Sequence, residues 1–275
     1  VNRKEISAIV VSENSHLKLG NEETENVNLK VNTDKGVATG IAMYNLDEAD
    51  RGGSLEINGK NFTLDVHATG EGSNKSTYGI LVGTKPNKDG ENCVVDIKSE
   101  NTVINVTNDS GLSYTANALT AWGGGTIRLN SGNVKISANN IINVKKNSLV
   151  EINADSLDKV IQLDGSIVFE CVDSTTDIDS DVVLNLTNSN SYLNGNILVT
   201  NLGDGHSGTV DGMKLGLSNG ATWSTTEEGS FVNYLTFNGG IINNNWDINN
   251  IGNIKGDRDY SMNIDNMTGT GGTII

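Results

Sequence analysis

The residues best suited to chemistry in this sequence are clustered carboxylates. Asp173, Asp177, Asp179 and Asp181 form a run in which acidic side chains recur at close spacing. Hard cations such as calcium need several oxygen ligands, so Asp177, Asp179 and Asp181 are candidate calcium ligands. The run lacks the glycine at the sixth position and the glutamate at the twelfth that an EF-hand loop requires. We therefore expect a solvated acidic turn, with a calcium site as the alternative.

The sequence offers little for catalysis. The chain has three histidines, and His206-Ser207 lies in a Gly-rich stretch that fits neither of the common serine-hydrolase motifs. The triglycine at 123–125 is not followed by the Lys-Ser/Thr pair of a phosphate-binding loop. No spacing of cysteine and histidine suits zinc. We expect no catalytic residues and no cofactor other than calcium.

The composition indicates a chain with many turns and an acidic surface. The 275 residues carry a formal net charge of −15, from 34 acidic and 19 basic side chains. This charge repels phosphate backbones and anionic lipid headgroups, so nucleic acid and bare membrane are disfavoured as partners. No apolar run approaches the roughly 18 residues of a membrane-spanning helix, so we expect no transmembrane segment. The 36% of hydrophobic residues is enough to build a core.

A three-part repeat organises the chain. Gly40–Met43 recurs as Gly79–Val82 and, more loosely, as Ala118–Ala121, with a spacing of 39 residues at each step. Two further alternating segments follow each copy, and in the first copy these are Ser54–Ile57 and Phe62–Val66. Three short strands cannot bury a core within one unit, so the units must stack.

No helical spacing links these strands, so equivalent strands are expected to pair in parallel as the chain coils around an axis. The sequence therefore predicts an all-β fold, a right-handed three-sided parallel β-helix, as a single domain over residues 1–275. Long insertions interrupt the coils up to about residue 140, tighter coils follow over about 141–210, and the last coils occupy about 211–275.

The alternation within each strand predicts which side chains face inward. The expected inward ladders are Leu55, Val95, Ile127 and Val150 in the second strands, and Leu64, Ile104 and Val134 in the third strands. The expected outward ladders are Glu56, Asp96, Arg128 and Glu151 in the second strands, and Asp65, Asn105 and Lys135 in the third strands. Cys93 and Cys171 alternate with aliphatic residues, so we expect two buried thiols on different coils, too far apart for a disulfide.

Long polar insertions recur at two corners of the repeat. They cover 45–53 and 84–92 at one corner, and 67–77 and 107–117 at the other. Because the corners repeat, we expect these loops to stack along two edges of a rod. Loops on a rigid scaffold are where binding usually occurs.

Three segments resemble the passenger domains of bacterial autotransporters of the pertactin and AIDA-like group. The most specific is Leu215–Trp223 followed by Ser230–Gly240, which is similar to the family's L-x-L-x-N-G-A-x-W … S-x-V-x-x-L-x-x-x-G-G pattern. Tyr78-Gly79-Ile80 resembles the opening of the common repeat of these passengers, and Met262–Thr273 resembles the strand that leads into their autochaperone segment. The family also carries a signal peptide and a membrane barrel, so the resemblance implies a fragment of a longer protein.

The resemblance implies a secreted protein of the bacterial cell surface, exported through the outer membrane by type V secretion. It further implies an adhesin in self-association, biofilm formation or virulence, whose partner is another copy of itself or a host surface protein or glycan. The candidate binding residues are Asp47, Glu48, Asp50, Asp65, Lys85, Lys88, Asp89, Asn105, Lys135 and Trp122. The alternatives are a polysaccharide-degrading enzyme on the same scaffold and a passive stalk for a domain that precedes it.

Overall fold

A computed structural model describes residues 5–12, 15–34, 37–45, 52–69, 76–84, 92–109, 115–171, 179–200, 210–225, 230–244 and 262–275. The part of the chain so described is all-β and contains no helix. It accordingly offers no helix that is long and apolar enough to cross a membrane. Nineteen strands of the described residues join in one sheet, and every pairing found between them is parallel. This arrangement confirms the predicted all-β class and is consistent with a solenoid-like fold.

Strand pairing follows three series, which we call rows 1, 2 and 3. Row 1 comprises β1 (Glu5–Ser12), β4 (Val37–Asn45), β6 (Thr77–Thr84), β8 (Ala116–Trp122), the second halves of β10 (Asn133–Lys145) and β12 (Ile161–Glu170), and β15 (Ile197–Thr200). Row 2 comprises β2 (His16–Leu19), the first halves of β5 (Ser54–Ala68) and β7 (Val94–Asn108), β9 (Thr126–Leu129), β11 (Leu149–Ile152), β13 (Asp181–Leu186), β16 (Met213–Ser218), and the first halves of β18 (Phe231–Asn244) and β19 (Asn263–Ile274). Row 3 comprises β3 (Asn26–Thr33), the second halves of β5 and β7, the first halves of β10 and β12, β14 (Tyr192–Asn194), β17 (Thr222–Thr225), and the second halves of β18 and β19.

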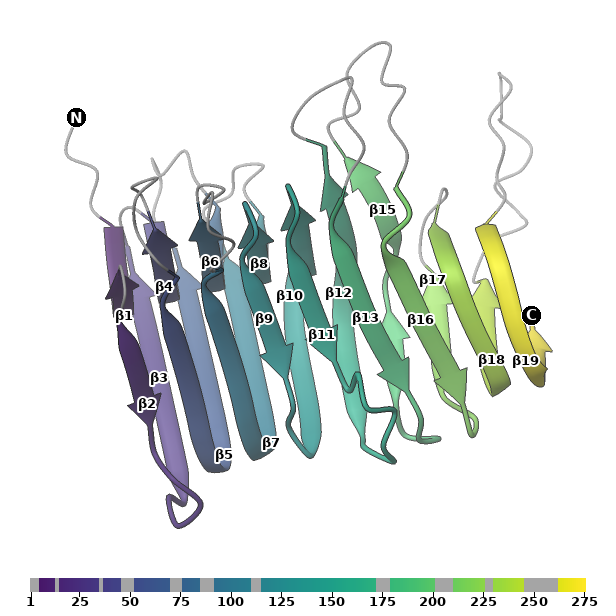
Figure 1. Cartoon of the computed structure of the whole chain (residues 1–275), viewed down its shortest axis with the longest axis horizontal. Coiled ribbons are helices and arrows are strands. Elements are labelled where there is room, and N and C mark those ends of the chain that lie inside the picture. The colour runs from purple at the N-terminus through teal and green to yellow at the C-terminus, as the bar shows by residue number, and fades with distance from the viewer. Residues whose placement is uncertain are drawn as a thin grey trace.

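Within each row, successive strands come from successive repeats of the sequence. The strands of each row therefore lie side by side in the order of the sequence, from the N-terminal end of the stack to its C-terminal end (Figure 1). Ile41 pairs with Ile80 and Ile80 with Leu119, as the spacing of 39 residues requires. The repeat found in the sequence is thus the unit of strand stacking.

Aliphatic side chains at alternate positions form one continuous core. The predicted row 2 ladder of Leu55, Val95, Ile127 and Val150 is in register and fully buried. The residues that follow them are Glu56, Asp96, Arg128 and Glu151, which are also in register and only half-buried. Both predictions for this row are confirmed. The four charged side chains point outward because burying an unpaired charge in an aliphatic core costs a large amount of free energy.

The register of row 3 differs from the prediction at β10. Leu64 pairs with Ile104 as expected, but Ile104 then pairs with Ile136, while Val134 pairs with Thr102. The predicted third-strand ladder is therefore wrong by two residues at its last position. A shift of two residues preserves the inward and outward alternation, so the hydrophobic pattern alone does not detect it.

The segment that resembles autotransporter passengers forms a tight turn between rows 2 and 3. β16 and β17 are joined by Asn219, Gly220 and Ala221, and the first two have φ values of 55° and 81°. Asparagine and glycine adopt this left-handed region most readily, which explains the Asn-Gly pair. Trp223 follows on β17, is fully buried, and donates its indole N–H to the carbonyl of Gly195 at 3.0 Å. Trp223 therefore has a structural role in the core.

Candidate functional site

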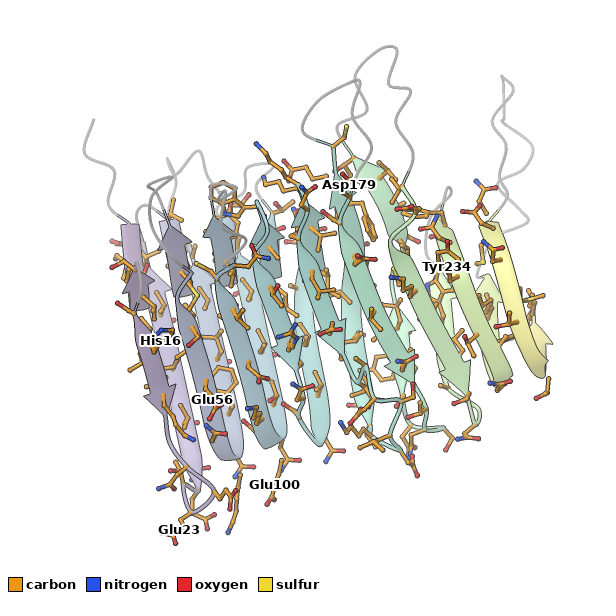
Figure 2. All side chains as sticks on the ribbon, in the orientation of Figure 1. His16, Glu23, Glu56, Glu100, Asp179 and Tyr234 are labelled. Carbon is orange, nitrogen blue, oxygen red and sulfur yellow. The ribbon has the colours of Figure 1, made fainter. Side chains whose placement is uncertain are left out.

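The outward side chains of row 2 form a network of ion pairs at the N-terminal end. Glu56 accepts from Lys18 and Lys98, each at 2.8 Å, and Lys98 also pairs with Asp96 at 3.2 Å. The hydrogen bonds from the Lys18 and Lys98 ammonium groups, together with one from Asn58, lower the pKa of Glu56 to about 2. Figure 2 shows Glu56 and His16 on the same side of these strands. The charged side chains at this end of row 2 are therefore paired with one another within the chain.

Ion pairs continue along the molecule between adjacent strands. Arg128 Nε donates to Glu151 at 2.7 Å in row 2. Lys145 pairs with Glu170 at 3.1 Å in row 1. Each pair joins residues of neighbouring strands, so these charges stabilise the stack and are not gathered around a cleft.

Row 3 carries a ladder of asparagines that sequence reasoning missed. Asn61 donates its amide N–H to Asn26 at 3.2 Å, Asn101 to Asn61 at 3.1 Å, and Asn133 to Asn101 at 2.9 Å. The ladder ends where the backbone N–H of Val160 donates to Asn133 Oδ1 at 3.3 Å. The signal in the sequence is an asparagine directly before the alternating third segment in four successive repeats.

The predicted outward ladder of row 3 is only partly formed. Asn105 donates to Asp65 at 2.8 Å, so these two predicted site residues lie together. Lys135 does not join them, because the register at β10 places it beside Val103. Ser137 stands beside Asn105 instead. The predicted grouping of Asp65, Asn105 and Lys135 is therefore wrong for the lysine.

A shallow depression surrounds Lys135 on row 3. Its volume is about 290 Å³. Lys135 is exposed, with Val103 beside it on β7 and Gln162 beside it on β12. The complete lining consists of Asn101, Thr102, Val103, Asn133, Val134, Lys135, Val160 and Gln162.

Six of the predicted binding residues lie outside the described residues. These are Asp47, Glu48, Asp50, Lys85, Lys88 and Asp89. His206 and Ser207 lie outside them as well. The assignments of these residues stay predictions.

Trp122 lies at the end of β8 and is half-buried, not fully exposed. It pairs with Gly83 on β6, and its indole occupies the space that a side chain at Gly83 would need. A Cβ on Gly83 would stand 1.8 Å from the indole Nε1. Part of the indole surface is thus used in packing between neighbouring strands.

Two of the three candidate calcium ligands, Asp179 and Asp181, lie within the described residues. Asp181 Oδ1 accepts from Lys214 at 2.7 Å between the neighbouring strands β13 and β16 of row 2. Asp179 is exposed near the start of β13 (Figure 2), and Asp177 lies outside the described residues. Where the structure describes the chain, no group of three or more potential ligands is close enough to hold a metal ion. Calcium binding by this acidic run stays a prediction.

A histidine and a serine meet on row 2, a contact that the sequence did not suggest. His16 Nδ1 lies 2.8 Å from Ser54 Oγ, and the two residues pair across β2 and β5. The pair is exposed, and no carboxylate contact to the other ring nitrogen is found in the described part. A nucleophile needs a base that a third group orients, so the pair lacks the elements of a hydrolytic site.

Both cysteines are buried thiols and are not joined in a disulfide bond, as predicted. Burial raises the pKa of the Cys93 thiol, because desolvation disfavours the thiolate. A raised pKa and burial both reduce reactivity toward oxidants and alkylating reagents.

Comparisons of the chain with protein-family models, with curated proteins and with solved structures find no match. The resemblance to autotransporter passengers thus remains a hypothesis that rests on the residues quoted for it.

Proposed function

We propose that this chain is a right-handed, three-sided parallel β-helix of an autotransporter passenger, exported to the bacterial surface, where it acts as an adhesin and not as an enzyme. Its partner is another copy on a neighbouring cell, or a host surface protein or glycan. The resemblance of Leu215–Trp223 and Ser230–Gly240 to passenger sequences supports the family and the location.

The observation that carries the adhesive function is the register of the strands that flank the long insertions. Asn45 pairs with Thr84 where β4 and β6 end, and Ser54 pairs with Val94 where β5 and β7 begin. The insertions at 46–53 and 85–93 therefore leave and rejoin the stack at neighbouring positions. A rigid scaffold thus holds their ends side by side, as an array of repeated contacts requires.

The second set of insertions has the same relationship. Ala68 pairs with Asn108 where β5 and β7 end, and Thr77 pairs with Ala116 where β6 and β8 begin. Many weak polar contacts repeated along such an edge add through multivalency, because the first contact raises the effective concentration of the next. This supports attachment through long edges and not through one pocket.

Electrostatics constrain how two copies can associate. With a net charge of −15, two identical chains repel each other overall. Self-association then needs local matching of acidic and basic groups, hydrogen bonds from asparagine and threonine, or bridging cations. In this proposal the candidate residues of the insertions, from Asp47 to Asp50 and from Lys85 to Asp89, supply both signs of charge.

Display of the chain on a non-adherent bacterium tests the proposal. Cell settling measures clumping, and attachment to cultured host cells measures host binding. We expect the displayed chain to raise at least one of them, and charge-neutral substitutions at Asp47, Glu48, Asp50, Lys85, Lys88 and Asp89 together to reduce that signal. A matched variant with neutral substitutions at Glu22, Glu23 and Asp155, which lie in turns between rows 2 and 3, serves as the control.

Salt and chelator distinguish the routes of association. Clumping that weakens with salt alone indicates direct ion pairs, whereas clumping lost with chelator and restored by calcium assigns a role to the acidic run at 173–181. If the sixfold variant clumps and attaches as the unaltered chain does, the insertion edges are not the adhesive surface. Turnover of polysaccharide by the purified chain would overturn the non-enzymatic assignment.

A further inference from the structure

We propose that the depression around Lys135 binds a carboxylate-bearing sugar of an acidic glycan. This assignment deepens the proposed adhesin function by naming a ligand class, and it rests on that function for its biological role. The binding itself is a property of the purified chain, which allows the two to be tested separately.

The first argument is that Lys135 has no counter-ion. Seven other lysines and arginines of the described chain are in ion pairs with carboxylates. Lys135 forms no such pair with any described residue, although the protein is strongly acidic overall. Its outward neighbours are Val103 and Gln162 on the adjacent strands and Asn133 and Ser137 on its own, all uncharged.

The nearest acidic positions on this row are already occupied. Asp164 lies two residues beyond Gln162 on β12, beside Ser137, and its two oxygens accept from Tyr192 Oη and Asn194 Nδ2, both at 3.0 Å. Asp65 lies on β5, two strands from Lys135, and accepts from Asn105 on β7. The Lys135 ammonium is therefore left available for an external anion.

The second argument concerns the walls of the depression, which suit a sugar ring. Val103 and Val160 provide apolar surface, against which the C–H faces of a pyranose can pack. Asn133 uses one amide N–H in the asparagine ladder and retains the other, and Gln162 makes only a long contact of 3.4 Å to the carbonyl of Asn190. These amides can donate to and accept from sugar hydroxyls.

The Lys135 ammonium, the neutral amides and the apolar valine surface together favour an acidic sugar over other anions. Bidentate recognition of phosphate or sulfate generally uses arginine, and no arginine lines this depression. One ammonium with neutral amides and a small apolar surface matches one carboxylate on a ring with several hydroxyls. The volume of about 290 Å³ is at the lower end for small-molecule sites, so one sugar unit would occupy it while the chain of the glycan continues along the open row.

Titration calorimetry with the purified chain and a trimer of galacturonic acid tests the inference. We expect binding of the trimer, and a loss of affinity of roughly tenfold or more in Lys135→Gln, since a hydrogen bond to a charged group is removed. Val103→Trp fills the depression and should abolish binding independently of the charge. Lys30→Gln removes another cation of row 3 without an ion pair and should leave the affinity unchanged.

Four results would overturn the proposal. They are no binding of the trimer by the unaltered chain, equal binding of its neutral methyl ester, unchanged binding in both Lys135→Gln and Val103→Trp, and equal binding of a glutamate peptide with the same dependence on Lys135. Adhesion assays on the same variants separate the two proposals. Sugar binding by a chain that promotes no adhesion would contradict the adhesin function and leave the site intact.

Discussion

Gly83 and Trp122 form a packing pair between two successive strands of row 1. They are partners in the register of β6 and β8, and the indole of Trp122 covers the face of Gly83 so closely that a Cβ there would stand 1.8 Å from Nε1. The glycine is required here for space and not for backbone conformation, since its φ is not positive.

Replacement of Gly83 by alanine should therefore act through Trp122. We expect Gly83→Ala to lower the free energy of unfolding by about 1–3 kcal/mol, because the indole must be displaced. In a Trp122→Ala background the same change should be neutral or stabilising by about 0.4–1 kcal/mol, since alanine reduces the entropy of the unfolded chain. A double-mutant cycle from urea unfolding measures the difference, and a cost that persists without Trp122 would show that the indole is not the obstacle.

The asparagine ladder should contribute to stability through its inner members. Asn101 donates to Asn61 and accepts from Asn133, so Asn101→Ala removes two hydrogen bonds. We expect a loss of about 1–2 kcal/mol in urea unfolding. Ser137→Ala, on an exposed position of the same row, is the control and should change the stability by no more than about 0.5 kcal/mol. Equal effects of the two changes would argue against a ladder that stabilises the stack.

The two sides of row 2 should differ strongly in their response to the same truncation. Leu55 is fully buried in the inward ladder, whereas Leu149 lies at an outward position and is half-buried. Leu55→Ala should cost about 2–5 kcal/mol because it leaves a cavity, and Leu149→Ala should cost markedly less. Since coupling in a stacked chain is between neighbours, hydrogen exchange should show increased opening first in β2, β5 and β7. A larger effect at Leu149 would contradict the assigned orientation.

The Glu56 network predicts a specific dependence of stability on pH. The folded pKa of Glu56 is lowered from 4.5 to about 2, so the ionised carboxylate is favoured in the folded state. The stability that Glu56 adds over Glu56→Gln should be fully present above pH 4.5 and lost as the pH falls through about 2. Urea unfolding of both proteins across this interval checks the sign, and high salt should reduce the difference because the group is partly exposed. A difference that grows toward low pH would be inconsistent with this network.

The sequence alone determined the repeat, the parallel stacking and the orientation of row 2. Leu55, Val95 and Ile127 recur at matching places, and a strand has a period of two, so burial of one set forces the next residues outward. The burial of both thiols and the absence of a disulfide between them followed from the same alternation. The anchors of the long insertions were also predictable, because the insertions interrupt the repeat at the same place in successive copies.

The tertiary structure decided the register of row 3 and, with it, the surroundings of Lys135. Val134 and Ile136 both point inward, so either satisfies the hydrophobic pattern opposite Ile104. The geometry of the corner settles the choice: Asn101 and Asn133 each follow the last inward residue of their row 2 strand by the same number of residues and pair directly. Alternation fixes only which face a side chain takes, whereas hydrogen bonding between neighbouring strands fixes which side chains meet. The asparagine ladder and the neutral neighbours of Lys135 are consequences of that pairing.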